Sequence, residues 1–513
     1  MSDPGSRLDD HVGQFRDVRR QLEDAILPLA TSVDGRRFSF QAPLRGLELQ
    51  PGGYAAIEDD GARRLGQVLD VDVAHVDGPE VGREIGEAAD AFDLRSRTVL
   101  RLARGSGVVL DGQSGPFHDA SVHAAPPDAV SAWIERVQPG GAALTVGELA
   151  LVEGVPLSLA AGGFDRHTFL CGQSGSGKTY ALGTILERLL LETTLRIVVL
   201  DPNSDFVRLT ELREGIDEGL SDRYREAASG VVVRRAAERG TERLRLRFAE
   251  LDPQTQAAAL RLDPIHDRDE YSDLVQLLEQ TETGDRPPTP EALRELLDHE
   301  APVLGRRIQN LRVDRWQAWA AGDEGSLLDE LAASGPRCLV VDLGSLPTRE
   351  EQQLVAATVL GHLWERRAER EPMLVVLDEA HNVCPQVPEG ALLELATEHA
   401  VRIAGEGRKY GLYLLVVTQR PQKVHENVVS QCDNLALMRM NSLADLDYVG
   451  EVFSHAPRGL LERAVAFRQG EALFAGKLVS HPTLGRIGAR LSEEGGSDVP
   501  ADWAQAAGPS ASE

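Results

Sequence analysis

The feature that most constrains this chain is a glycine-rich segment between a short apolar run and a helix-forming run. Residues 172–179 read Gly-Gln-Ser-Gly-Ser-Gly-Lys-Thr and match the pattern G-x-x-x-x-G-K-[ST]. Glycines allow a tight turn that points several backbone N–H groups at phosphate oxygens. The helix that follows adds the positive end of its dipole. The segment therefore predicts a binding site for a nucleoside triphosphate.

Two side chains of this segment predict specific contacts. Lys178 can reach the β- and γ-phosphates, and the Thr179 hydroxyl can ligate Mg²⁺. The expected cofactors are therefore ATP and Mg²⁺. The residues expected to bind the nucleotide are Gly172, Gln173, Ser174, Gly175, Ser176, Gly177, Lys178, Thr179 and Tyr180.

The charge balance limits how the chain could meet nucleic acid. It has 54 basic and 81 acidic side chains, a formal net charge of −27. Such acidity argues against a protein that coats nucleic acid with its outer surface. It leaves open a ring whose basic residues line a central channel.

Apolar runs and cysteines point to a cytoplasmic protein. The sequence has no run of about 18 apolar residues and a polar N-terminus, so we expect neither a membrane span nor a signal peptide. The cysteines are scattered, without a C-x-x-C pair, and predict reduced, mostly buried thiols rather than a metal site. They are Cys171, Cys338, Cys384 and Cys432.

Changes in sequence texture predict the domain organisation. Short apolar runs at 53–57, 65–71 and 98–102, broken by acidic and glycine-rich turns, favour a small β-barrel. The expected units are an N-terminal helix (1–36), the barrel (37–125), a connector (126–145), an α/β core (146–208 and 335–490), a helical insertion (209–334) and a flexible tail (491–513).

The α/β core alternates apolar strands with helical runs. Residues 195–200, 338–343, 373–377 and 412–417 are strand-like. The alternation predicts a mainly parallel sheet with helices on both faces. In the helical insertion, Trp316 and Trp319 fall on an apolar stripe, which favours a core position over a stacking platform for bases.

Asp378 and Glu379 follow an apolar strand, where a hydrolytic enzyme needs them. Asp378 would hold Mg²⁺ through its water shell, and Glu379 would polarise the attacking water. The second carboxylate favours hydrolysis over mere binding. The alternative is an ordinary solvated turn at a strand end.

Other polar residues surround the next strand. Gln419 ends it, where an amide can orient water and sense the γ-phosphate. A guanidinium suits transition-state charge and often comes from a neighbouring subunit, which makes Arg402, Arg408, Arg420 and Arg439 candidates. His381 is expected to be a packed histidine. No pattern resembles a metal-ligand cluster, a Ser–His–Asp triad or a dinucleotide fingerprint.

Together these motifs resemble the HerA-type hexameric ATPases of the HerA/FtsK superfamily. The likeness covers residues 160–210 and 335–490, is weaker over the barrel, which looks like the family's HAS barrel, and does not extend to the insertion. Besides the phosphate loop, it is carried by Phe164-Asp165-Arg166-His167, Leu377-Asp378-Glu379-Ala380-His381, Gly407-Arg408-Lys409-Tyr410-Gly411, Thr418-Gln419-Arg420-Pro421, Ser430-Gln431-Cys432-Asp433, Arg439, Asp445 and Gly470-Glu471-Ala472.

The resemblance implies a RecA-like core and a homo-hexameric ring that threads double-stranded DNA through its central channel using ATP. It also implies a partner such as a NurA-type nuclease, in DNA repair by end processing or in phage defence. The roles it implies are phosphate and Mg²⁺ binding for Lys178 and Thr179, Mg²⁺ binding for Asp378, the catalytic base for Glu379, the sensor for Gln419, and a trans-acting arginine for Arg408 or Arg439. The family's acidic position after the second strand is Asp205 here.

Two other functions are open at this point. One is a nucleotide-gated ring scaffold that assembles an effector enzyme, which DNA-stimulated ATPase activity would distinguish from a motor. The other is a conjugation-type DNA pump, which would normally show a membrane anchor or a basic tail. ABC-type ATPases are disfavoured because no Leu-Ser-Gly-Gly signature precedes Asp378.

Overall fold

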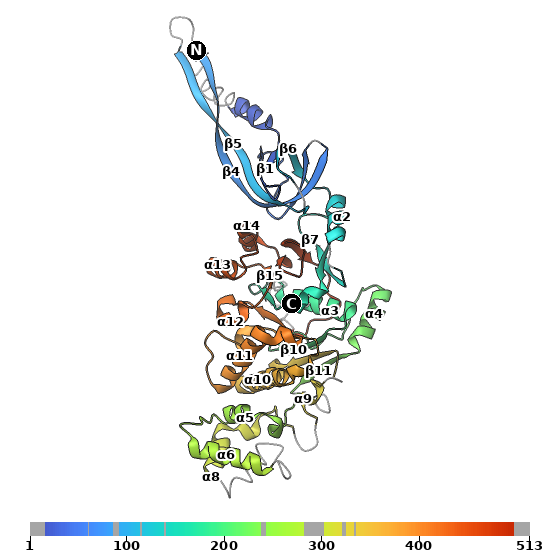
Figure 1. Cartoon of the computed structure of the whole chain (residues 1–513), viewed down its shortest axis with the longest axis vertical. Coiled ribbons are helices and arrows are strands. Elements are labelled where there is room, and N and C mark those ends of the chain that lie inside the picture. The colour runs from blue at the N-terminus through green and yellow to red at the C-terminus, as the bar shows by residue number, and fades with distance from the viewer. Residues whose placement is uncertain are drawn as a thin grey trace, which may run out of the picture.

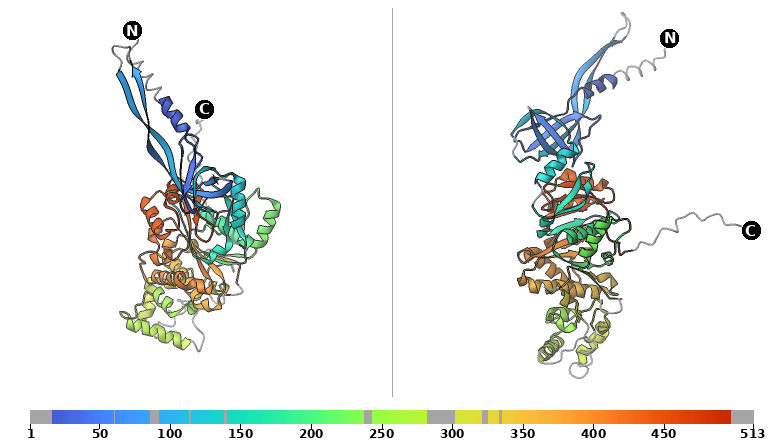
Figure 2. Two further views of the ribbon diagram at one scale, coloured as in Figure 1. Left: turned by 45° about the horizontal axis from the view of Figure 1, so that its top comes forward. Right: turned by 90° about the vertical axis from the view of Figure 1, so that its right-hand side faces the viewer.

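The computed structural model describes residues 16–59, 61–85, 92–112, 115–137, 140–236, 243–281, 302–320, 325–332 and 335–496. The described chain is elongated. A barrel lies at one end, a large sheet with flanking helices lies in the middle, and a group of helices lies at the other end (Figures 1 and 2). The predicted start of the N-terminal helix lies outside the described residues, and residues 16–24 are helical.

Six strands close into the N-terminal barrel in the order β1-β2-β5-β4-β3-β6. Its core is apolar and includes Phe38, Phe40, Ile57 and Val122. The predicted runs at 53–57, 65–71 and 98–102 all lie in its strands, and β4 and β5 continue beyond the barrel as a two-stranded ribbon (Figure 1). The strands are β1 (Leu29–Ser32), β2 (Arg37–Pro43), β3 (Tyr54–Asp59), β4 (Ala62–Ile85), β5 (Phe92–Val109) and β6 (Phe117–Ala124).

The central sheet has 11 strands in the order β11-β12-β10-β13-β14-β9-β15-β16-β17-β7-β8. The pairs from β11 to β15 are parallel, and those from β15 to β8 are antiparallel. The prediction of a mainly parallel α/β sheet is therefore confirmed. The strands are β7 (Ala143–Leu149), β8 (Pro156–Ala160), β9 (Thr168–Cys171), β10 (Arg196–Asp201), β11 (Val231–Arg235), β12 (Cys338–Asp342), β13 (Met373–Leu377), β14 (Leu412–Thr418), β15 (Asn434–Met438), β16 (Glu471–Ala475) and β17 (Thr483–Ile487).

Helices cover both faces of this sheet because successive strand residues point to opposite sides. In β13, Leu374 and Val376 pack in the apolar cluster that contains α3 (Lys178–Glu192). Val375 and Leu377 pack in the cluster that contains α10 (Arg349–Glu365) and α11 (Ala391–Glu406). Strands buried on both faces explain the continuous apolar runs in the sequence.

The range 209–334 differs from the helical insertion predicted for it. Its segment β11 is an edge strand of the central sheet, parallel to β12 with Val233 opposite Val340. A run of three valines before two arginines has strand propensity but no helical periodicity. The remaining elements of the range are helical: α4 (Glu218–Ala228), α5 (Pro253–Ala259), α6 (Arg268–Thr281), α8 (Pro302–Leu311) and α9 (Leu327–Glu330).

The predicted connector contains α2 (Pro127–Val137) and is followed by the hairpin of β7 and β8, which extends the central sheet. The four cysteines are buried and free, as predicted. None of the helices in the described part of the chain combines the length and hydropathy needed to span a bilayer.

Candidate active site

The phosphate loop connects β9 to α3, so the parallel sheet presents it at the carboxyl end of a central strand. Gly175 and Gly177 have φ of +73° and +90°, a region that glycine adopts without strain. The Ser176 carbonyl accepts a 2.9 Å hydrogen bond from the Gly470 amide. The Gln173 amide donates to the Arg439 carbonyl at 2.9 Å. The loop is therefore held from outside by the segments that follow β15 and precede β16.

Asp378 and Glu379 lie where β13 ends, on the same edge of the sheet as the phosphate loop. Lys178 donates a hydrogen bond from Nζ to Oε1 of Glu379 and is 7% exposed, as is Glu379. The parallel sheet thus brings together two motif residues that are 201 positions apart. Glu379 has φ of +43°, an uncommon conformation for a side chain other than glycine. Such strain persists where the surroundings enforce it, and it is concentrated at functional sites.

Asp378 belongs to a group of three carboxylates that could hold a metal ion. One oxygen each of Asp201, Asp205 and Asp378 lies within 4.8 Å of the others. Both oxygens of Asp378 are buried without a hydrogen-bond partner, and burial raises its pKa to about 8. No sequence pattern resembles a metal-ligand cluster here, because the three carboxylates come together only through the adjacency of β10 and β13 in the sheet.

Unlike Asp378, Asp201 has hydrogen-bond partners within the chain. Its carboxylate accepts hydrogen bonds from the amides of Asn203, Asp205 and Phe206, at 2.9–3.2 Å. Burial raises the pKa of Asp201 to about 7, against the effect of these amides. Asp201 thus shapes the turn that carries Asp205 beside Asp378.

His381 lies closer to the reacting groups than a merely packed histidine. Its Nδ1 is 3.2 Å from Oε2 of Glu379 and 3.1 Å from Oγ1 of Thr418. Burial lowers the pKa of His381. The side chain therefore links the end of β13 to the end of β14. Gln419 follows Thr418, whose carbonyl accepts from the Gly172 amide at 3.3 Å, so the candidate sensor lies beside the phosphate loop.

The two candidate trans-acting arginines lie at opposite ends of the parallel strands, Arg439 at the carboxyl end and Arg408 at the amino end. Arg439 follows β15, and its Nη2 donates to the Gly175 carbonyl of the same chain at 3.0 Å. Arg408 precedes β14 and pairs with Asp433 at 2.6 Å. Arg166, just before β9, lies 3.4 Å from the same carboxylate oxygen. Arg408 is therefore remote from the phosphate loop of its own chain.

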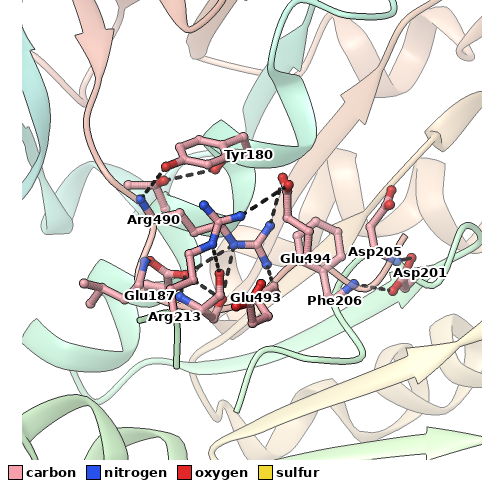
Figure 3. Close-up of polar contacts among 12 residues, drawn as sticks. Tyr180, Glu187, Asp201, Asp205, Phe206, Arg213, Arg490, Glu493 and Glu494 are labelled. Carbon is pink, nitrogen blue, oxygen red and sulfur yellow. Dashed lines mark hydrogen bonds and ion pairs between the residues drawn. The ribbon is translucent and has the colours of Figure 1, made fainter. Parts of the chain in front are cut away.

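A buried arginine ties the C-terminal segment to the helix of the phosphate loop (Figure 3). Arg490 pairs with Glu187 of α3, and both side chains are 0% exposed. Its amide donates to the hydroxyl of Tyr180 at 2.7 Å. A Cβ on Gly183 would lie 2.5 Å from the Arg490 guanidinium, so only glycine leaves room there.

The C-terminal segment also reaches the carboxylate group. The Gly495 amide donates to the Asp205 carbonyl at 3.0 Å. Residues 491–496, assigned by the sequence analysis to a flexible tail, are thus packed against the core, and 497–513 lie outside the described residues. Sequence reasoning missed Glu187 and Arg490. Asp201 ends an apolar strand, which is where ligands bind in parallel sheets, but no specific role was predicted for it.

Comparisons with known proteins show where similarities lie. Residues 144–363 match the family model of the central domain of helicase HerA. The chain is 24% identical over 403 residues to the DNA double-strand break repair helicase HerA of Pyrococcus furiosus, covering 68% of this chain and 70% of the relative. It is 35% identical over 127 residues to the helicase of the same name from Sulfurisphaera tokodaii, covering 25% of each chain.

Among solved structures, VirB4 of Thermoanaerobacter pseudethanolicus is similar with a TM-score of 0.49 and 16% identity, over 68% of this chain and 97% of that chain. The family-model match includes the phosphate loop and the strands β9 and β10 on either side of α3.

Proposed function

We propose that this chain is a HerA-type P-loop ATPase and acts as a ring-forming motor that moves double-stranded DNA at the expense of ATP. The observation that carries the proposal is the buried contact between Lys178 and Glu379, beside the unpartnered carboxylate of Asp378. A phosphate-binding lysine, a metal-binding carboxylate and a candidate base thus share one edge of the sheet.

The residues at this edge fit a Mg²⁺ ion. Mg²⁺ prefers oxygen ligands, and Asp378 offers two buried oxygens that no protein group satisfies. Thr179 and Asp378 would hold the ion, with Asp205 next to them. An ion held there would supply positive charge next to the phosphates, where negative charge develops during phosphoryl transfer.

The chain's own side chains have separable tasks in hydrolysis. Lys178 would bind the β- and γ-phosphates. Glu379 would accept a hydrogen bond from the attacking water and polarise it. The second oxygen of this carboxylate is buried without a hydrogen-bond partner and lies 3.2 Å from Nδ1 of His381. Gln419 would orient the same water from the end of β14 and respond to loss of the γ-phosphate.

A ring of subunits would complete the site. Arg408 lies at the amino end of the parallel strands, whereas the phosphate loop of its own chain lies at their carboxyl end. This position supports a role at the nucleotide of a neighbouring subunit. We propose a homo-hexamer with DNA in the central channel, an N-terminal barrel of the HAS type, and a NurA-like nuclease or another effector as partner.

The test is the ATPase rate as a function of duplex length at low and moderate salt. Because the net charge of −27 repels DNA, binding must come from a local positive channel. We expect stimulation only by duplexes long enough to thread the ring. We also expect log K to fall with log salt by about 0.9 for each neutralised phosphate. A flat response under both conditions, in a protein shown to be hexameric, would instead favour the nucleotide-gated scaffold.

A further inference from the structure

A cleft of about 1020 Å³ lies between the helical insertion and the ATPase core. The insertion lines it with residues of 258–264 and 311–317, and the core with residues of 347–353 and 389–392. No residue of the phosphate loop lines it, so it is distinct from the nucleotide site. It has no role in the hydrolytic chemistry described above.

The cleft gathers arginines whose charge is not neutralised. Arg312, Arg315 and Arg349 line it and are exposed. Among the described residues none of the three has a side-chain partner. A fourth arginine, Arg261, pairs with Glu350 at 3.3 Å. In a chain with a net charge of −27, these three guanidinium groups without a partner among the described residues are positive contact points collected in one cleft.

Most carboxylates of the cleft are already occupied. Glu351 is 1% exposed and accepts from the Ala318 amide at 3.1 Å. Asp263 accepts from the amides of Ile265 and His266 at 2.7 and 2.8 Å. Of the lining carboxylates, Glu389 alone has no partner within the described chain. The cleft is thus lined by four arginines and four carboxylates, and three of the arginines but only one of the carboxylates lack a partner in the part of the chain that the structure describes.

The conformation of Arg312 indicates that fold stability does not account for it. Arg312 has φ of +57°, and Arg261 has φ of +52°. A residue with a Cβ costs on the order of 1–3 kcal/mol in this region. Glycine would adopt the same turn without that cost. The turn at Arg312 therefore does not itself require an arginine.

An aromatic side chain lies in the same cleft. Trp316 is half-buried and lines the cleft, with its ring stacked on Trp319 at 6.0 Å and an interplanar angle of 12°. Trp319 is fixed because its Nε1 donates to the Val313 carbonyl at 2.7 Å. Trp319 is a core residue, as the sequence predicts, whereas Trp316 also faces the cleft.

We propose that this cleft binds a single strand of nucleic acid, with its phosphates on Arg312, Arg315 and Arg349 and a base against Trp316. The choice of nucleic acid rests on the proposed function. Three separate guanidinium groups exceed what one free phosphate needs, and they match the repeated charges of a strand. A duplex keeps its bases stacked, so only an unpaired strand can offer one to Trp316. An acidic peptide would leave the ring without a stacking partner.

The experiment uses the full-length protein and fluorescence anisotropy of a labelled dT oligomer of about 20 nucleotides, with a blunt duplex of equal length as competitor. For Arg312→Glu/Arg315→Glu we expect at least a tenfold weaker affinity for the oligomer. The slope of log K against log salt should be smaller by about 1.4, which is 0.7 for each lost contact. Trp316→Ala should weaken binding about fivefold or more, since stacking contributes about 1–3 kcal/mol.

The control is Arg306→Glu, which makes the same charge change on an exposed residue of α8 outside the cleft. It should leave the affinity within about twofold of wild type. Thermal midpoints verify that each variant is folded, and Arg349→Glu replaces the double variant if that one is not. Unchanged oligomer affinity and salt slope in the folded variants would overturn the proposal. So would an equal loss of duplex and oligomer binding.

The result separates this site from the proposed function. If wild-type ATPase activity is not stimulated by any duplex, yet oligomer binding depends on the cleft, the motor is wrong and the cleft site stands. If duplex stimulates the ATPase and the cleft variants bind the oligomer normally, the cleft site is wrong and the motor stands.

Discussion

Arg490 and Glu187 form an ion pair in which neither side chain is exposed, with Nε of Arg490 3.3 Å from Oε1 of Glu187. Glu187 also accepts hydrogen bonds from the amides of Leu491 and Ser492, both at 2.8 Å. The carboxylate therefore anchors the C-terminal segment to α3, the helix that begins at Lys178. Since the same segment contacts Asp205, it connects the helix of the phosphate loop to the three candidate metal-binding carboxylates.

Glu187→Gln should strongly destabilise the protein. It leaves the buried Arg490 guanidinium with only the partly exposed carboxylate of Glu494, 3.6 Å away, and loss of a buried partner costs up to about 3–5 kcal/mol of unfolding free energy. Urea unfolding measures this cost. The matched control is Glu192→Gln on the same helix, whose pair with Arg223 is solvent-exposed and should contribute less than about 1 kcal/mol. Equal effects of the two variants would contradict the role assigned to the buried pair.

Glu379→Gln should separate nucleotide binding from hydrolysis. The amide keeps the size of the side chain and can still accept from Lys178, but it polarises water poorly. We therefore expect ATP binding close to wild type and a loss of turnover of at least about a hundredfold, the lower range for general base catalysis. Equilibrium binding of a fluorescent ATP analogue and steady-state phosphate release measure the two quantities.

Lys178→Ala is the counterpart of this substitution, and it should weaken nucleotide binding itself because the phosphate charge loses its nearest cation. Normal ATP turnover in Glu379→Gln would contradict the assignment of Glu379 as the catalytic base. Loss of nucleotide binding in Glu379→Gln would show instead that the carboxylate mainly positions Lys178.

The sequence predicted those parts of the site that follow from local patterns. Lys178, Asp378 and Glu379 each lie at a strand end with a recognisable neighbourhood, so the parallel sheet that places them together could be predicted too. No local sequence pattern predicts roles for Arg490 and Glu187, because their contact joins residues 303 positions apart in the sequence. Asp201 lay at a recognised strand end, but its contacts with three amides depend on the turn that follows it.

The misplaced elements have equally specific causes. The segment β11 is short and ends in two arginines, and its partner β12 is more than a hundred residues later, so local texture favoured a helical unit. The C-terminal residues 491–496 are polar and glycine-rich, which is typical of a flexible tail. These residues are held in place by hydrogen bonds to Glu187 and Asp205, and no local sequence pattern predicts such long-range contacts.

His481 should make stability fall at mildly acidic pH. It lies between β16 and β17, with Nε2 2.7 Å from the Tyr54 hydroxyl of the barrel and its ring edge-on to Trp133 of α2. Burial lowers the pKa of His481 to about 4, below the value near 6.5 of an unfolded histidine. Its stabilising effect is therefore full above pH 6.5 and is lost as the pH falls toward 4. At pH 5 the loss is on the order of 2 kcal/mol.

The measurement is the thermal midpoint of wild type and His481→Gln between pH 5 and pH 7.5. Glutamine can still bond to Tyr54 but does not titrate, so the variant should lose less stability on acidification. The difference between the two proteins should shrink as the pH is lowered. Parallel curves would show that protonation of His481 is not linked to unfolding.

Arg408 and Arg439 should differ in which subunit they serve. Arg439 contacts the phosphate loop of its own chain through the Gly175 carbonyl. Arg408 precedes β14, whose last residue Thr418 lies opposite Cys171, next to the loop. The seven residues of that strand span about 20 Å, so Arg408 lies at the far end of the strand from the loop. We therefore expect Arg408, and not Arg439, to act at the nucleotide of a neighbouring subunit.

Mixing subunits tests this expectation directly. Rings of Arg408→Ala alone or Lys178→Ala alone should be inactive. In mixed rings, some sites combine an intact Lys178 from one subunit with an intact Arg408 from its neighbour, so the mixture should regain ATPase activity. A mixture of Arg439→Ala and Lys178→Ala should regain none, because both residues would belong to the same chain's site. Recovery in the Arg439 mixture, with none in the Arg408 mixture, would reverse the assignment, since only a residue supplied across the subunit boundary can be complemented in this way.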